Sequence, residues 1–172
     1  MRRGELRGEN EPCSRSLEIF GKGDFASERN LSELRRASIT HIVNVGESPN
    51  QLHPEDGPFV RLAWCPIEDL VLIPEDAALE CLEVLHTATC DGDSNVYIHC
   101  VAGWNRSPTI LSLYLLACGV ERGIASKLVS QASYDAVPFH SKLINEELLK
   151  SVVKHGHSSF LPHKRPQAIL TP

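Results

Sequence analysis

Positions 99–109 hold the residues whose types and spacing could do chemistry, and they read HCVAGWNRSPT. Cys100 is followed six positions later by Arg106, and Ser107 comes next. A thiol is a weak nucleophile at neutral pH until a helix N-terminus and a nearby cation lower its pKa. The same positive environment attracts a phosphate dianion, whose oxygens an arginine can bind in pairs. The spacing therefore predicts a thiolate held under a phosphate, in-line attack on phosphorus, and a phosphocysteine intermediate.

The elements on either side must position this loop. Residues 95–99 form a short apolar run that is typical of a strand. The helix predicted at 108–118 begins with Pro108 and ends before Gly119. A loop between a strand and a helix N-terminus delivers backbone N–H groups to an anion, and Gly103 would allow a close approach. The predicted phosphate-binding residues are Val101, Ala102, Gly103, Trp104, Asn105 and Arg106.

The rest of the chain alternates between strand and helix patterns. Strands are predicted at 16–20, 40–45, 59–63 and 95–99, and helices at 27–37, from 74 onward, near 121–133 and near 139–154. The alternation predicts an α/β fold with a central, twisted, mostly parallel or mixed sheet of four to five strands, flanked by helices on both faces. Three segments are expected: a flexible leader at 1–15, a catalytic domain at 16–155 and a flexible tail at 156–172.

Length and composition favour a single globular domain. The chain has 172 residues, of which 42% are hydrophobic, enough for a substantial core. No apolar run approaches the roughly 18 residues that a membrane span needs, and the polar start argues against a signal peptide. We therefore expect a monomer in the cytoplasm, with the nucleus as an additional location. Six cysteines without CxxC spacing are expected to be reduced thiols.

The charge distribution argues against nucleic acid as a partner. Residues 17–147 hold nineteen acidic side chains against nine lysines and arginines, in a chain whose net charge is −5. Affinity for a nucleic-acid backbone needs clustered lysine and arginine. Residues 148–172 hold four basic side chains and no acidic one, which is too sparse for a strong cluster and is typical of a solvated tail.

The loop resembles the HCxxxxxR(S/T) loop of the cysteine-based protein tyrosine phosphatases, and the wider chain resembles their dual-specificity branch. The segments Leu17–Gly21 and Ile39–Val45 are similar to that branch's opening strand and second strand, and Pro66–Asp69 resembles its acid loop. The resemblance covers residues 16 to 150. It implies a phosphatase that acts on phosphorylated protein, on phosphotyrosine as well as phosphoserine and phosphothreonine, and that needs no metal or cofactor.

The resemblance also implies a role for each residue of the site. Cys100 would be the nucleophile, Arg106 would bind the phosphate, and Asp69 would be the general acid. Ser107 would steady the thiolate and assist the second step, while His99 would orient the loop. Asp69 stands 31 positions before Cys100, a separation that fits the family's acid loop.

Three alternatives stay open at this point. The run Gly103–Arg106 is also found in the RNA 5′-triphosphatases of mRNA capping, so a triphosphate end is a second candidate substrate. A phosphoinositide or a phosphoglucan could be bound by the same loop, and the loop could also belong to a phosphate-binding module without catalysis.

Trp104 would either stack on a ring of the substrate or pack against a neighbouring loop. Residues 129–135 lack the arginine that the branch often carries there. His155, His157 and His163 could bind a stray metal, but a flexible tail is the favoured explanation.

Overall fold

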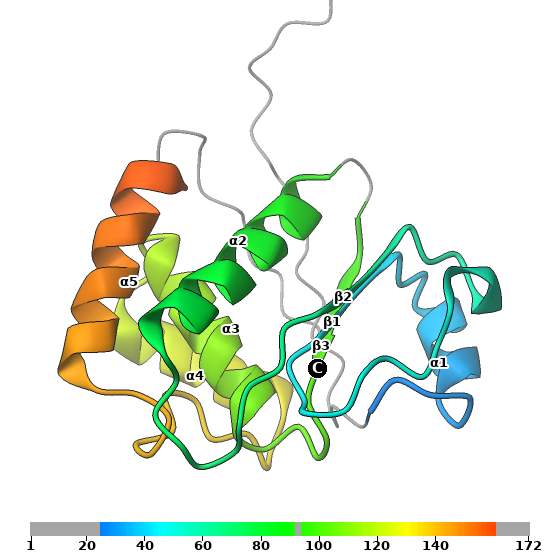
Figure 1. Cartoon of the computed structure of the whole chain (residues 1–172), viewed down its shortest axis with the longest axis horizontal. Helices are drawn as coiled ribbons and strands as arrows, with labels where there is room; N and C mark the ends of the chain where they lie inside the picture. Colours follow the sequence, from blue (N-terminus) through cyan, green and yellow to red (C-terminus); the bar gives the residue numbers. More distant parts are fainter. Residues whose placement is uncertain (1–24, 92–93, 161–172) are drawn as a thin grey trace, which may run out of the picture.

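The computed structural model describes residues 25–91 and 94–160. Strands and helices alternate along these residues, which confirms the predicted α/β class (Figure 1). The elements are α1 (Leu31–Arg36), β1 (His41–Asn44), a short 3₁₀ helix (Pro54–Asp56), β2 (Arg61–Trp64), α2 (Glu75–Cys90), β3 (Val96–His99), α3 (Arg106–Ala117), α4 (Arg122–Ala132) and α5 (Glu146–Ser159).

The sheet is parallel, with the strands in the order β2-β1-β3. The described residues form three strands, so the predicted count of four to five is wrong for this part of the chain. The strand predicted at 16–20 lies outside the described residues, and the other three predicted strands are present. Asn44 is in register with both Trp64 and His99. All three strands therefore end at one edge of the sheet, where the loops that follow them meet.

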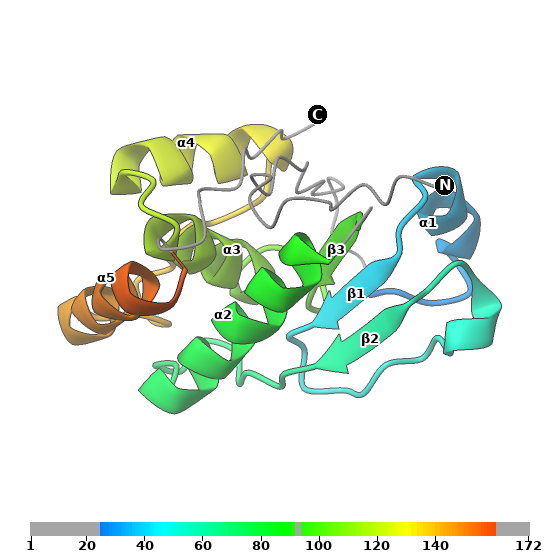
Figure 2. The ribbon, with the colours of Figure 1, turned by 90° about the horizontal axis from the view of Figure 1, so that it is seen from above.

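Side chains alternate between the two faces of the sheet and build two hydrophobic clusters. Val43 and Ile98 point into the larger cluster, whose other members come chiefly from α2, α3, α4 and α5. Ile42 and Tyr97 point the other way, into a smaller cluster that includes Leu34 of α1. The figures show α1 on one side of the sheet and α2, α3, α4 and α5 on the opposite side (Figures 1 and 2). The prediction of helices on both faces is therefore confirmed.

Helix α3 runs through the centre of the larger layer, where it contacts β3, α2, α4 and α5. Eleven of its twelve residues are buried. It begins at Arg106, two residues before the predicted start. Pro108 is tolerated in the first turn, because the first four N–H groups of a helix have no partner within it and the missing N–H of proline loses no hydrogen bond there. The earlier start places Arg106 and Ser107 in the first turn of the helix, directly after the cysteine loop.

Helix α5 differs from its prediction at both ends. It begins at Glu146 rather than near 139, where Asn145 caps it by accepting a hydrogen bond from Leu148 N at 2.8 Å. It continues to Ser159 and is followed by Phe160, whose buried ring stacks on His86 at 4.1 Å. The domain boundary predicted at 155 therefore falls inside a packed helix. The rest of the predicted tail, 161–172, and the predicted leader lie outside the described residues.

We predict that Gly156→Ala will destabilise the fold. A Cβ atom at Gly156 would collide with the backbone of Ala117, at the point where α5 crosses the end of α3. Overpacking of this kind costs about 1–3 kcal/mol, which exceeds the gain in helix propensity from glycine to alanine. Urea unfolding followed by circular dichroism measures the difference in the free energy of unfolding.

The matched control is Gly123→Ala in α4. A Cβ there would meet only the flexible carboxylate of Glu121, at 3.1 Å, so we expect no loss of stability beyond about 0.5 kcal/mol. Equal unfolding free energies for Gly156→Ala and the wild type would show that α3 and α5 are not packed as closely as described.

Candidate active site

Three loops leave the same edge of the sheet and form the site. They are residues 45–52 after β1, residues 65–74 after β2, and the loop between β3 and α3, Cys100–Asn105, called the cysteine loop below. Because the strands are parallel and in register, residues distant in the sequence become neighbours here. The structure brings all the predicted catalytic residues together: Cys100, Arg106, Ser107 and Asp69.

Cys100 is almost fully buried, with 2% of its surface exposed. Ser107 Oγ donates a hydrogen bond to Cys100 Sγ at 3.4 Å. Burial by itself raises the pKa of the Cys100 thiol, since it disfavours the charged form. Hydrogen bonds from the Ser107 hydroxyl and from the backbone N–H groups of Ser107 and Gly103, together with the charge of Arg106, outweigh burial, so the pKa lies below its ordinary value. The surroundings of this cysteine therefore favour the nucleophilic thiolate.

His99 holds the backbone of the cysteine loop through a hydrogen bond to Cys100. Its Nδ1 lies 2.9 Å from the carbonyl oxygen of Cys100, and because a carbonyl only accepts, Nδ1 carries the proton and donates it. Burial lowers the pKa of His99 to about 4, so the ring is neutral at pH 7. The rings of Phe25 and Tyr97 lie against it at 4.9 and 5.6 Å. A neutral, enclosed imidazole fits the predicted role of orienting the loop and not that of a proton donor.

The cysteine loop turns sharply before α3. Gly103 has a φ of 71°, a conformation that glycine adopts at no cost. The carbonyl of Trp104 accepts a hydrogen bond from Val137 N at 2.8 Å, which ties the loop to the segment between α4 and α5. The indole of Trp104 is 56% exposed, so it is not packed beneath a neighbouring loop. Val101 and Ala102 are also exposed.

Arg106 is buried and held on several sides. Its Nη1 donates to Glu47 Oε2 at 3.0 Å and to the Ile67 carbonyl at 3.2 Å. Its Nε lies 3.8 Å from Asp69 Oδ1 and makes no hydrogen bond within the described residues. The guanidinium is thus fixed by two other loops while a buried donor is left for the oxygen of an anion.

Asp69 is tied to the cysteine loop by a hydrogen-bonded side chain. Asn105 Nδ2 donates to its two carboxylate oxygens at 3.3 and 3.5 Å. Asp69 Oδ1 also accepts from Leu70 N at 3.0 Å, and Leu70 has the unusual φ of 59°. Glu68 is exposed and makes no such contact in the described part of the chain. The geometry therefore selects Asp69, and not its neighbour Glu68, as the acid of the site.

Two contributions to the site were missed by sequence reasoning. Glu47 was not among the predicted site residues, yet its carboxylate binds Arg106. Asn105 had been assigned to phosphate, yet its side chain holds Asp69. A signal for Glu47 exists in the sequence, because an acid soon after a buried parallel strand must lie at the carboxyl edge of the sheet. No signal for the Asn105 side chain stands out, since the direction of a loop side chain does not follow from spacing.

The histidines near the C-terminal end of the domain do not gather with other ligands. His155 Nε2 lies 2.6 Å from Glu83 Oε1, and His163 lies outside the described residues. Within residues 25–91 and 94–160, no cluster of three or more His, Cys, Asp or Glu side chains could hold a metal ion. Among the same residues, no helix combines the length and the apolar character that a bilayer crossing requires.

Taken together, a strand–loop–helix with a stabilised thiolate, a buried arginine and a tethered carboxylate defines a cysteine-based phosphatase site. Comparison with known proteins gives the same class. A family model described as PTP-SAK, Swiss Army Knife protein, DSP-PTPase phosphatase domain, matches residues 19–156. The protein therefore belongs to this family, within the dual-specificity branch that the loop itself resembles.

Individual relatives agree with this assignment. Human dual specificity protein phosphatase 15 is 34% identical over 95 residues, which are 55% of this chain but only 30% of that protein. Protein tyrosine phosphatase type IVA 3 of Bos taurus is 25% identical over 139 residues, which are 80% of this chain and 76% of that protein. The crystal structure of human DUSP28 has the same fold, with a TM-score of 0.60 at 20% identity over 84% of this chain and 94% of that one. The match to the first relative thus spans about a third of its length.

We predict that Ser107→Ala will raise the pKa of Cys100. The substitution removes a donor that stabilises only the thiolate, so the charged form becomes less favourable and the titration moves to higher pH. The rate of alkylation by iodoacetamide, measured across pH with mass spectrometry to resolve each cysteine, reports this midpoint. Cys90, which is exposed on α2, is the internal control and should titrate unchanged. An unchanged or lower midpoint for Cys100 would contradict the assigned hydrogen bond.

Proposed function

We propose that the protein hydrolyses phosphomonoesters on phosphorylated proteins through a phosphocysteine intermediate. The observation that carries the proposal is the arrangement around Cys100: a thiol with a lowered pKa, bonded to Ser107, beside a buried Arg106 whose Nε lies 3.8 Å from Asp69. A binding module would need the arginine and the loop N–H groups, but it would need neither an activated thiol nor a tethered acid.

Each residue has one task in the first step. Arg106 and the N–H groups of the cysteine loop bind the non-bridging oxygens of the phosphoryl group. Cys100 Sγ attacks phosphorus, and the bond from phosphorus to the ester oxygen breaks. Asp69 protonates that oxygen as it leaves, which avoids expelling an alkoxide.

The second step regenerates the enzyme. Asp69, now a carboxylate, accepts a proton from a water that attacks phosphorus, and the phosphorus–sulfur bond breaks. The leaving thiolate of Cys100 is stabilised by the Ser107 hydroxyl, which already bonds to it in the resting site. The products are inorganic phosphate and the dephosphorylated side chain, and neither step requires a redox change.

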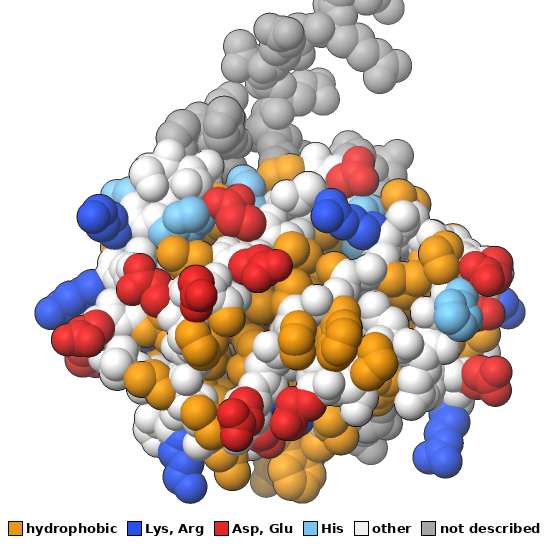
Figure 3. All heavy atoms as spheres, in the orientation of Figure 1, with side chains coloured by type: hydrophobic (Ala, Val, Ile, Leu, Met, Phe, Trp, Pro, Cys, Tyr) orange, Lys and Arg blue, Asp and Glu red, His pale blue; other side chains and the backbone are white. Residues whose placement is uncertain are grey.

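The surface around the site supports a protein substrate. Large apolar side chains are exposed on the cysteine loop and on two segments that border it. They are Leu70, Val71 and Leu72 after β2, Val101 and Trp104 in the loop, and Tyr134 and Val137 between α4 and α5. Hydrophobic and acidic side chains also gather along the lower edge of the face in Figure 3, where Figure 1 places the loops after the strands. Exposed apolar side chains at such density are typical of a surface that binds another protein.

The same surface disfavours the polyanionic alternatives. Residues 46–52, 64–73, 101–105 and 133–138 contain no lysine, arginine or histidine, while Glu47 and Glu68 add negative charge. A 5′-triphosphorylated RNA or a polyphosphoinositide carries several charges that such a rim would repel. Arg29, on the α1 side of the cysteine loop, is a single exposed cation, which suits one additional anionic group rather than a polyanion. A phosphorylated side chain brings one phosphoryl group, which Arg106 and the loop can neutralise. The cytoplasmic location and the monomeric state stay predictions from the sequence.

We predict that a substrate panel will separate these candidates. An aryl phosphate and phosphopeptides carrying phosphotyrosine or phosphoserine should be turned over, and a 5′-triphosphorylated RNA and phosphoinositides should not. Cys100→Ser should abolish all turnover, because a hydroxyl at neutral pH is a far poorer nucleophile, while the unfolding curve stays close to that of the wild type. Substantial hydrolysis by Cys100→Ser, or a preference for RNA or lipid over the peptides, would overturn the proposed function.

We predict that the effect of Asp69→Asn will depend on the leaving group. On a phosphoserine peptide, whose alkoxide leaves poorly, kcat should fall by about 10²–10⁴-fold, the usual contribution of general acid catalysis. On an aryl phosphate with a good leaving group the loss should be much smaller. Steady-state kinetics on both substrates measure the difference.

Glu68→Gln is the matched control for this prediction. The two acids are adjacent, but Glu68 makes no contact with Asn105 or Arg106, so its kcat should stay within about twofold of the wild type on both substrates. If the two variants exchanged their effects, the acid would be Glu68, and the contact between Asp69 and Asn105 would have no catalytic meaning.

A further inference from the structure

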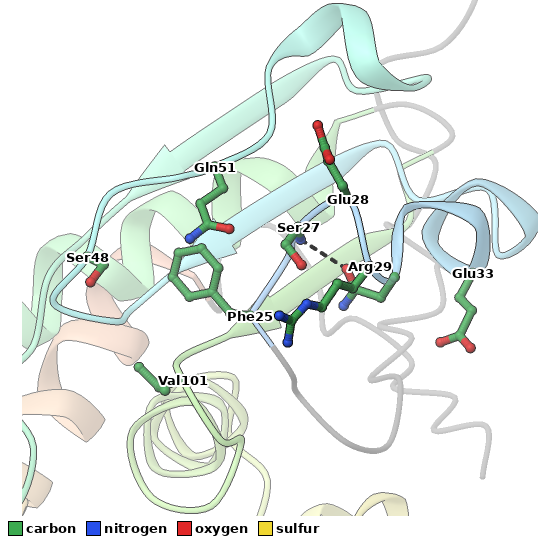
Figure 4. A pocket seen from close by; sticks show the side chains of 9 residues that line it. Phe25, Ser27, Glu28, Arg29, Glu33, Ser48, Gln51 and Val101 are labelled. Atoms are coloured by element: carbon green, nitrogen blue, oxygen red, sulfur yellow. Dashed lines mark hydrogen bonds between the residues drawn. The ribbon is translucent and has the colours of Figure 1, made fainter.

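A hollow opens beside the cysteine loop, on the α1 side of the molecule (Figure 4). Its volume is about 920 Å³. The lining comes from the segment that leads into α1, from the loop after β1, and from the cysteine loop itself. The hollow is lined by Phe25, Ser27, Glu28, Arg29, Asn30, Glu33, Ser48, Gln51 and Val101, so two acidic side chains share the lining with one arginine.

The lining of the hollow adjoins catalytic-site residues in the chain at two points. Val101, on its wall, is the residue after Cys100 in the chain. Ser48, which also lines it, follows Glu47, whose carboxylate binds Arg106. A substrate chain whose phosphorylated residue occupies the cysteine loop and whose flank runs toward α1 would place a neighbouring residue close to this hollow.

Arg29 gives the hollow its chemical character. It is the only cation among the residues that line it, and it makes no hydrogen bond or ion pair with any described residue. Figure 4 shows its guanidinium extending along the hollow toward Phe25, while the carboxylates of Glu28 and Glu33 point elsewhere. An unpaired guanidinium offers a planar set of donors that fits a carboxylate or a phosphoryl group.

Neutral donors surround the same space. The hydroxyls of Ser27 and Ser48 and the amide of Gln51 line the hollow and can donate to an oxyanion. The Ser27 N–H is already taken by Asn30 Oδ1 at 3.0 Å, which fixes the backbone next to Arg29. The Phe25 ring lies edge-on against His99, so the wall of the hollow rests on the residue that orients the cysteine loop.

We propose that this hollow binds an anionic side chain of the substrate, a few residues from the one that is dephosphorylated. The group it takes is an oxyanion, either the carboxylate of an acidic residue or a second phosphoryl group. Arg29 is the determinant of this preference, and it acts on specificity rather than on the chemical step. The inference rests on the proposed function, because it requires a phosphorylated protein as the substrate.

The test compares phosphotyrosine peptides that differ only in the flanking residues. One peptide has alanine flanks, one glutamate, one phosphoserine and one lysine, and an aryl phosphate serves as a substrate too small to reach the hollow. For the wild type we expect kcat/KM to be about fivefold higher with an anionic flank than with alanine, mainly through KM, as for one partly exposed ion pair. The larger of the glutamate and phosphoserine effects identifies the preferred oxyanion.

Two variants and one control assign the effect to Arg29. Arg29→Ala should abolish the preference for anionic flanks, and Arg29→Glu should invert it in favour of lysine flanks. Arg36→Ala, which removes another exposed arginine of the same region that does not line the hollow, should keep the wild-type preference. Turnover of the aryl phosphate by each variant confirms that it is folded.

The outcomes separate the two hypotheses. If all the phosphopeptides are hydrolysed but anionic flanks give no advantage, or the advantage survives in Arg29→Ala, the inference is wrong and the proposed function stands. If the aryl phosphate is hydrolysed but none of the phosphopeptides is, the proposed function fails and the inference falls with it.

Discussion

The constraint on which the structure depends is an almost fully buried thiol whose charged form must be stabilised. Cys100 is 2% exposed, and an uncompensated buried charge would cost several kcal/mol. The compensation comes from the first turn of α3, where Ser107 donates twice, and from Gly103 N–H and the charge of Arg106. That turn can face the sulfur only because α3 begins at Arg106 and lies buried against β3 and three helices. Much of the core packing therefore fixes the N-terminus of α3 in the orientation that faces Cys100 Sγ.

Arg106 links the surroundings of Cys100 to the other two loops of the site. Its guanidinium contacts Glu47 from the loop after β1 and Ile67 and Asp69 from the loop after β2. Two carboxylates and a thiolate thus surround one cation, and a phosphate dianion would add to the excess of negative charge. Asp69 therefore lies beside the same guanidinium whose Nε is left available to an anion.

Sequence reasoning reached the parts of the site that are local in the chain. Cys100, Arg106 and Ser107 lie within eight residues, so the spacing alone places them on one loop and one helix turn. Asp69 required the family resemblance, because nothing in its own surroundings distinguishes it from Glu68. The bond from Glu47 to Arg106 joins residues 59 positions apart, and it depends on strand register that the sequence does not display. The start of α5 was missed because residues 139–145 carry enough apolar side chains to imitate a helix, whereas the cap at Asn145 decides the boundary.

Chemistry and specificity lie on different kinds of residue in this protein. Cys100, Arg106, Ser107 and His99 are buried, and their positions are over-determined by packing and hydrogen bonds. The side chains around them that we associate with substrate choice are exposed, up to 99% for Tyr134. Such side chains add little to stability, so they can change without disturbing the thiolate. A fold built in this way can keep one reaction while the rim and the Arg29 hollow decide which phosphorylated chain reaches it.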